Sequence, residues 1–215
     1  MKNRFNLIIF DWDGTLSNSI DWIVGCLQKA AARCHCPVPE PDSARQVIGL
    51  SIDRAIETLF PDADAPTRKW LIECYTAEYR ARELDRDDLF PGVYDMLVQL
   101  QDAGYRLAVA TGKTRRGLDR ALHATDTKEL FCITRCADET ASKPDPGMLK
   151  EIIRYADIAP ERALMVGDTV HDLQMAENAR ISSVAVACGA HPESLLQRYR
   201  PLQCLQQPTE LLKFI

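Results

Sequence analysis

The sequence predicts an α/β fold, in which a doubly wound parallel sheet carries an inserted α-helical domain. Short continuous apolar runs, which are typical of strands buried on both faces, alternate with helical patterns over most of the chain. Residues 19–87 break this alternation, because they contain helical patterns and no such run. Charged or hydroxyl residues directly follow several of the predicted strands. We therefore expect residues 1–18 and 88–215 to form an α/β core, and residues 19–87 to form a helical cap domain.

The core strands are predicted from short runs of apolar residues. The first strand covers residues 6–11, where the sequence NLIIFD is apolar until it ends in a carboxylate. Later strands are expected over residues 106–110, 131–134, 163–166 and 183–187. Because helical patterns separate these runs, we expect the strands to be parallel.

The core helices are predicted from apolar residues at helical spacing. The helix before the second strand has such residues at positions 93, 96, 97 and 100, with Pro91 placed for its first turn and Gly104 for its end. Further core helices are expected over residues 115–124, 146–156 and 170–179.

The cap domain is predicted to contain helices only. Its clearest helices cover residues 21–34 and 67–84, and two shorter ones cover residues 43–50 and 52–60. The proline-rich segment 37–41 is expected to be an extended connection. Near the other end of the chain, residues 201–208 are predicted to be weakly structured.

Composition excludes several classes of protein. The 215 residues are 46% hydrophobic and 27% charged, as in ordinary globular proteins, and the net charge of −5 offers no general attraction to nucleic acid or to an anionic membrane. No apolar run near the start is long enough for a signal peptide, and the eight scattered cysteines are typical of reduced thiols, so we expect a cytoplasmic protein. A zinc site at Cys34 and Cys36 is not expected, because no second pair lies at a suitable spacing.

Two carboxylates follow the first predicted strand in the segment DWDGTL, residues 11–16. On an extended backbone Asp11 and Asp13 project to the same face, where they repel one another unless a cation or a shared proton lies between them. An Asx turn at a strand end is the alternative explanation for an isolated motif of this kind. A calcium-binding loop is excluded, because Leu16 and Trp22 stand where that loop requires glycine and glutamate.

A hydroxyl group and a lysine lie after later strands. Thr111 and Gly112 can offer a hydroxyl and a backbone amide to phosphate oxygens, although a helix N-cap also explains this pair. A nucleotide-binding P-loop is excluded, because its first glycine would fall at Leu107. Lys143 precedes a proline that favours an extended loop, but a lone lysine is usually a solvated surface residue.

The last motif, GDTVHD, begins at the end of the fourth predicted strand. It places Asp168 at the strand end and Asp172 at a helix start, where the helix dipole alone would favour an acidic residue. Ligands bind at the carboxyl edge of an open parallel sheet, and all four motifs fall at this edge. Their coincidence favours one shared site over four separate structural explanations.

With these motifs the chain resembles the haloacid dehalogenase-like phosphatases, which have a Rossmann-like core. The resemblance rests on DWDGTL, the threonine of TGK, the lysine of SKP and GDTVHD, and it covers essentially the whole chain, including the helical insert. Among these enzymes the chain looks most like phosphoglycolate phosphatases. The resemblance therefore implies a Mg²⁺-dependent hydrolase acting on a small phosphorylated metabolite, as a monomer or homodimer, without nucleic acid or membrane partners.

The resemblance also implies a role for each motif residue. Asp11 would be the nucleophile that forms an aspartyl-phosphate, and Asp13 would be the general acid and base. Lys143 would neutralise Asp11 and the phosphoryl group, which Thr111 and the amide of Gly112 would hydrogen-bond. The Mg²⁺ ligands would be Asp11, the backbone carbonyl of Asp13 and Asp168, with support from Asp172.

Two sets of basic residues are candidates for substrate recognition, and each has two explanations. Lys113 and the charged residues after it either contact a substrate carboxylate or form a solvated helix start. Arg45, which precedes the glycine turn at Gly49, is either a contact to a substrate carboxylate in the cap or part of an ordinary helix end. The alternative functions are those of a phosphosugar mutase, of a pyrophosphatase, and of a non-catalytic binding module that keeps the fold.

Overall fold

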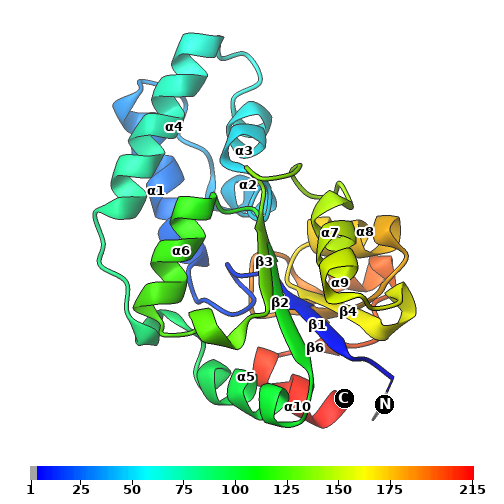
Figure 1. The fold of residues 1–215 in the computed structure, drawn as a ribbon. Coiled ribbons are helices and arrows are strands. Elements are labelled where there is room, and N and C mark those ends of the chain that lie inside the picture. Colours follow the sequence, from blue (N-terminus) through cyan, green and yellow to red (C-terminus); the bar gives the residue numbers. More distant parts are fainter. Residues whose placement is uncertain (1–3) are drawn as a thin grey trace.

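The computed structural model describes residues 4–215 and confirms the predicted α/β fold. Six strands form one parallel sheet in the order β3-β2-β1-β4-β5-β6 (Figure 1). The strands are β1 (Leu7–Phe10), β2 (Arg106–Thr111), β3 (Ile133–Cys136), β4 (Ala163–Gly167), β5 (Ser182–Val186) and β6 (Cys204–Leu205). The chain order reverses beside β1, so the carboxyl ends of β1, β2 and β4 meet at one place.

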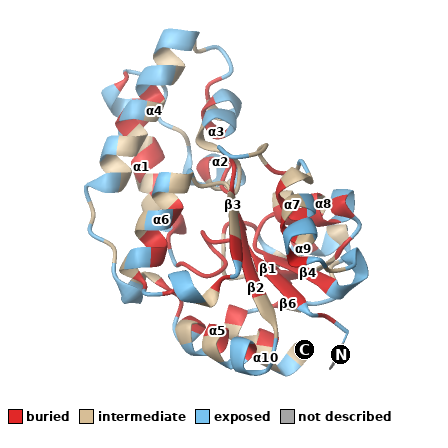
Figure 2. Ribbon diagram, in the orientation of Figure 1, coloured by how far each residue is buried: buried red, intermediate tan, exposed pale blue. Residues whose placement is uncertain are grey.

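Helices cover both faces of the sheet. Ile8, Phe10 and alternate residues of the neighbouring strands pack against α5 (Val93–Asp102), α6 (Arg115–Ala124) and α10 (Leu211–Phe214). Leu7 and Ile9 face the opposite side and pack against α7 (Gly147–Ala156) and α8 (Val170–Ala179). Since neighbouring strand residues point to opposite faces, strands that are apolar throughout are buried on both sides, as Figure 2 shows.

The helices between β1 and α5 pack around a hydrophobic cluster of their own. They are α1 (Ile20–Arg33), α2 (Pro41–Gln46), α3 (Ile52–Leu59) and α4 (Ala65–Arg80). The two connections to the core are hydrogen-bonded to each other: the amide of Asn18 donates to the carbonyl of Asp88 over 2.8 Å, and that of Phe90 donates to Leu16 over 2.9 Å. We call these helices the cap; boundaries at residues 19 and 87 stay a prediction.

The prediction differs from the structure in the cap helices and at the edges of the sheet. The helix expected over 43–50 is α2, which covers 41–46, because Pro41 is tolerated in its first turn. The helix expected over 67–84 is α4, which covers 65–80. The strand expected over 131–134 is β3, which begins two residues later and contains the half-buried residues Thr134 and Arg135. The segment 201–208, expected to be weakly structured, contains β6, whose two residues pair with β5. Edge strands bury one side incompletely and can be very short, so they lack the apolar run that marked the central strands.

The shorter elements complete the description. Helix α9 (Glu193–Leu196) lies between β5 and β6. Short 3₁₀ turns occur along the chain from the end of the cap onwards; they are η1 (Arg86–Asp88), η2 (Lys128–Leu130), η3 (Pro160–Arg162), η4 (Gln197–Tyr199) and η5 (Pro208–Glu210). Within residues 4–215, no helix has both the length and the apolar character needed to cross a membrane. All eight cysteines are free thiols.

Candidate active site

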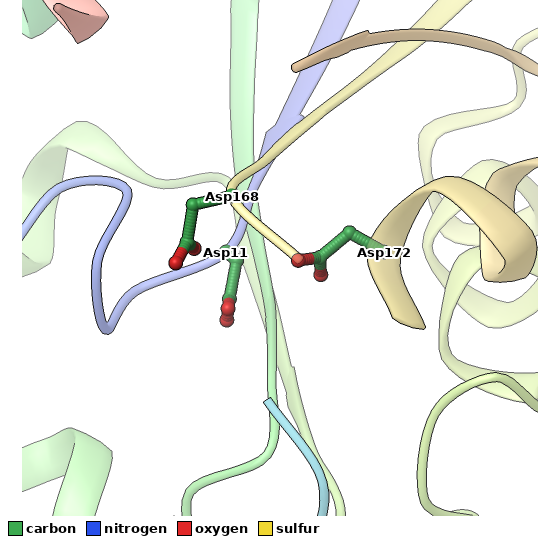
Figure 3. Close-up of side chains that lie close together, drawn as sticks. All are labelled: Asp11, Asp168 and Asp172. Carbon is green, nitrogen blue, oxygen red and sulfur yellow. The ribbon is translucent and has the colours of Figure 1, made fainter. Parts of the chain in front are cut away.

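Three buried aspartates meet at the carboxyl edge of the sheet (Figure 3). Asp11 follows β1, Asp168 follows β4, and Asp172 lies in the first turn of α8. One carboxylate oxygen from each lies within 4.8 Å of the others. The register of the strands explains why Asp11 and Asp168 lie close together. Phe10 and Val166 are partners in neighbouring parallel strands, and the two aspartates follow directly after the ends of these strands.

Lys143 is the cation that lies against this cluster. Its Nζ atom lies 2.8 Å from Oδ1 of Asp11 and 2.6 Å from Oδ1 of Asp172, and its side chain is fully buried. Burial acts to lower the pKa of Lys143, but the two carboxylates outweigh it and raise that pKa above its ordinary value. The lysine is therefore a fixed positive charge, which would otherwise be unfavourable in the interior.

One lysine does not neutralise three carboxylates. Burial raises the pKa of Asp11 to about 7, against the opposing effect of Lys143, and Asp172 and Asp13 raise it further. Burial also raises the pKa of Asp168 well above its ordinary value, with Asp11 adding to the effect. The cluster thus carries an excess of negative charge that a cation would relieve.

The hydrogen bonds of the aspartates show where such a cation fits. Neither carboxylate oxygen of Asp11 receives a hydrogen bond of ordinary geometry from the described residues. Asp168 accepts from the Thr15 hydroxyl over 2.8 Å and from the Ala190 amide over 2.7 Å, which holds the carboxylate in place. Hard divalent cations such as Mg²⁺ prefer carboxylate oxygens, so Asp11 and Asp168 together suit this ion.

Asp172 is engaged differently from the other two aspartates. Its Oδ2 accepts hydrogen bonds from the amide and the hydroxyl of Thr169, as part of the capping box that begins α8. Its Oδ1 faces Lys143. Both oxygens therefore have partners, and Asp172 holds the lysine in position. The expected support of the Mg²⁺ ligands by Asp172 stays a prediction.

Two glycines make room for Asp168. A β-carbon on Gly14, whose φ is +77°, or on Gly189 would come closer than 3.0 Å to the carboxylate of Asp168. Gly14 is visible in the DWDGTL motif, whereas nothing in the sequence marks Gly189 as part of the site. Both positions are close approaches of the backbone that only glycine allows.

Asp13 belongs to a second group of polar residues. Its Oδ1 accepts a hydrogen bond from the Ser19 hydroxyl over 2.6 Å and lies 2.9 Å from Nζ of Lys113. Lys113 also donates to the hydroxyl of Tyr79 over 2.7 Å and lies 4.6 Å from the centre of that ring. Neither Ser19 nor Tyr79 could be recognised from the sequence, because no motif marks either residue. Ser19 and Lys113 thus hold the side chain of Asp13, and Tyr79 of the cap is linked to it through Lys113.

The loop after β2 lies directly beneath the cap. Thr111 is buried, and a β-carbon on Gly112 would lie 2.5 Å from the carbonyl oxygen of Leu50 and 2.6 Å from that of Gly49. The glycine thus allows the cap backbone to approach the core backbone at the site. This contact is a structural reason for Gly112 besides the expected hydrogen bond to a phosphoryl oxygen.

A cavity of about 540 Å³ opens from the carboxylates into the interface between cap and core. The structure brings Asp11, Asp13, Thr111, Gly112 and Lys113 together along its wall. Lys143, Asp168 and Asp172 lie next to Asp11 but do not line the cavity themselves.

The structure does not bring Arg45 to the cavity. Its guanidinium pairs with Asp21 over 2.9 Å and with Asp42 over 3.3 Å on the outside of the cap. The glycine turn predicted to present a substrate contact does reach the wall, through Gly49 and Leu50. Helix α2 ends at Gln46, and Arg45 lies on its outer side, where two carboxylates attract it.

Comparison with known proteins relates this geometry to a family. A family model described as haloacid dehalogenase-like hydrolase matches residues 8–186. The pyrophosphatase PpaX of Bacillus mycoides is 25% identical over 213 residues, which are 99% of this chain and 97% of that protein. The tyrosine-protein kinase PtkA of Mycobacterium tuberculosis is 34% identical over 184 residues, 85% of this chain but 62% of the kinase. The crystal structure of a predicted phosphoglycolate phosphatase from Haemophilus somnus has a TM-score of 0.86 at 22% identity, covering 100% of this chain and 99% of the other.

Proposed function

The chain belongs to the haloacid dehalogenase-like hydrolase family, and from this premise we propose that it is a Mg²⁺-dependent phosphomonoesterase acting through an aspartyl-phosphate. The observation that supports the proposal best is the environment of Asp11. This carboxylate lies at a strand end on the cavity wall, has no hydrogen bond of ordinary geometry from residues 4–215, and faces a buried lysine. A nucleophile needs a free lone pair and nearby positive charge, and Asp11 has both.

The first chemical step transfers the phosphoryl group to Asp11. An oxygen of Asp11 forms a bond to phosphorus while the bond from phosphorus to the ester oxygen breaks. The leaving oxygen keeps the electron pair and takes a proton from Asp13. In the second step, water attacks the phosphorus of the aspartyl-phosphate and gives a proton to Asp13 while the bond from phosphorus to Asp11 breaks. This step releases inorganic phosphate and restores the carboxylate of Asp11 and the protonated carboxyl group of Asp13.

The surrounding residues hold the charge that builds up on the phosphoryl oxygens. Lys143 faces Asp11 from behind the wall, and Thr111 and the amide of Gly112 lie where they can donate hydrogen bonds. Lys113 keeps Asp13 in position by its contact of 2.9 Å. Mg²⁺ would be held by Asp11, Asp168 and the backbone carbonyl of Asp13, and it supplies positive charge for the approach of an anionic nucleophile to an anionic phosphate.

The proposed substrate is a small phosphorylated metabolite, with phosphoglycolate as the reference compound. The proposed setting is the cytoplasm, without nucleic acid or membrane partners, and the proposed assembly is a monomer or a homodimer. A pyrophosphatase is the second candidate function, and the similarity to PpaX over 99% of the chain favours it. A phosphosugar mutase and a non-catalytic module remain further alternatives.

Phosphate release distinguishes these functions. We expect the purified protein to hydrolyse phenyl phosphate with Mg²⁺, to lose this activity in EDTA, and to lose it by several orders of magnitude in the Asp11→Asn variant. Faster release from pyrophosphate than from any monoester would favour the second candidate. Absence of hydrolysis of every phosphate ester and of pyrophosphate would refute the enzymatic proposal.

A further inference from the structure

The cavity above Asp11 is larger and less polar than a phosphate group requires. Its cap side is formed by apolar residues of α1, α3 and the turn after α2, including the partly exposed Leu50 and Ile52. Two tyrosines of α4, Tyr75 and Tyr79, also line it, and their rings stack with centres 5.8 Å apart at 30°. A wall of this kind excludes water from an apolar surface and favours a hydrocarbon or ring.

The volume supports the same conclusion. About 540 Å³ corresponds to roughly 18 water molecules, at ~30 Å³ each, and falls within the range of pockets that enclose whole organic ligands. Phosphoglycolate has only two carbon atoms beside its phosphate, so it leaves much of this space to water. A substrate that fills the cavity has an apolar body attached to its phosphate.

Three arginines also line the cavity. Arg116 and Arg120 are one turn apart on α6, on the same face of the helix, and Arg80 ends α4. Glu83 is the acidic residue that accompanies them. Figure 1 shows α6 beside the cap helices, where these residues bring positive charge to the wall.

Arg80 and Arg116 are exposed, whereas Arg120 is partly buried. Within residues 4–215, Arg80 and Arg116 form no ion pair and donate no hydrogen bond. Arg120 donates through Nη2 to the carbonyl of Arg82, while its Nη1 is buried and has no partner among the described residues. The neighbouring Arg115, by contrast, pairs with Asp119 and with Glu139. Unpartnered guanidinium groups beside a cavity are donors available to a ligand.

We propose that these arginines form a second anion subsite, so that the substrate is an organic phosphate with an apolar or ring body and a second anionic group. This inference rests on the proposed phosphatase function and specifies its substrate class. The scissile phosphate occupies the end near Asp11, the body lies against Leu50 and the stacked tyrosines, and the second anion pairs with Arg116 and Arg120. A guanidinium binds a carboxylate or a phosphate with two parallel hydrogen bonds, so either anion suits the subsite.

Three phosphate esters separate the parts of this proposal. Phosphoglycolate carries the second anion without a body, phenyl phosphate carries a body without the anion, and 3- or 4-carboxyphenyl phosphate carries both. We expect the wild-type kcat/KM for the better carboxyphenyl phosphate to exceed the other two by about 10-fold or more, as a charge-assisted contact provides. Arg116→Glu should lower the ratio of carboxyphenyl to phenyl phosphate by at least about 10-fold.

The charge reversal needs a control elsewhere on the surface. Arg198 is exposed and does not line the cavity, so Arg198→Glu makes the same change in net charge and should leave the ratio unaltered. Arg116→Lys keeps the charge without the guanidinium fork and should give an intermediate ratio. Thermal unfolding of each variant verifies that the fold is retained.

The outcomes distinguish failure of the anion-subsite proposal from failure of the proposed phosphatase function. Equal kcat/KM values for phenyl and carboxyphenyl phosphates, or a ratio that Arg116→Glu leaves unchanged, would overturn the subsite while the phosphatase function stands. A preference for phosphoglycolate over both aryl esters would overturn the apolar body. Failure of wild-type protein to hydrolyse all three esters in Mg²⁺ would instead contradict the proposed function itself.

Discussion

Replacing Asp11 by asparagine should stabilise the metal-free fold while it removes activity. The carboxylate is buried beside Asp168 and Asp172, and Lys143 is the cation within reach of it. Asparagine has nearly the same shape but no charge, so it relieves part of the excess negative charge. It also cannot act as the proposed nucleophile.

The size of the effect follows from the pKa of Asp11. Burial raises this pKa from 3.8 to about 7, so an ionised Asp11 costs the folded state about 4 kcal/mol, at ~1.36 kcal/mol for each pH unit. Because the folded state holds its proton more tightly than the unfolded chain does, stability declines as the pH rises from about 4 to about 7. The full cost is present above pH 7 and is absent below the unfolded pKa of 3.8.

Urea unfolding in EDTA measures this difference directly. We expect Asp11→Asn to be about 2–4 kcal/mol more stable than wild type at pH 8, and the gain to shrink markedly at pH 5. Mg²⁺ should then stabilise wild type more than the variant at pH 8, since it binds the ionised carboxylate. A variant that is less stable than wild type at pH 8, or a gain that does not depend on pH, would refute the reasoning.

Three other substitutions test separate features. Asp13→Asn should lower kcat for alkyl phosphates by about 10²–10⁴-fold, and it should lower kcat much less for aryl phosphates with good leaving groups. Equal losses of kcat on the two classes of ester would contradict proton transfer by Asp13. Gly112→Ala should raise KM or lower kcat at least several-fold, because its β-carbon meets two cap carbonyls, whereas Gly25→Ala, with no atom within 4 Å, should leave the kinetics unchanged. Arg180→Gly should stabilise the protein by about 0.5–1 kcal/mol in urea unfolding, because Arg180 ends α8 at a φ of 59°; an unchanged or lower stability would show that no strain is relieved.

The aspartates of the site could be predicted because parallel sheets have a simple rule of assembly. An aspartate follows closely after β1 and after β4, and the register of these two strands brings Asp11 and Asp168 to the same edge. The helices α6 and α8 were predicted with the bounds that the structure has, since their apolar spacing and caps agree. Here local sequence and global fold specify the same structure.

The cap contacts could not be predicted in the same way. Tyr79 reaches Lys113 only because α4 packs against α1 over the core, and an amphipathic pattern gives the buried face of a helix but not its partner. Arg45 is a residue for which the sequence predicted a contact that the structure does not have. Its place near a glycine turn suggested a substrate contact, whereas two nearby carboxylates hold it on the outer surface.

The paired connections between cap and core have a consequence for how this architecture can diversify. Residues 16–18 and 88–90 run side by side and are hydrogen-bonded to each other, so the chain leaves the core and returns to it at one point. A folded insert whose two ends are adjacent can be exchanged for another without altering the strand order or the position of Asp11. Recombination at this junction would therefore exchange the apolar wall of the cavity as a unit, while Arg116, Arg120 and the hydrolytic machinery of the core are inherited unchanged.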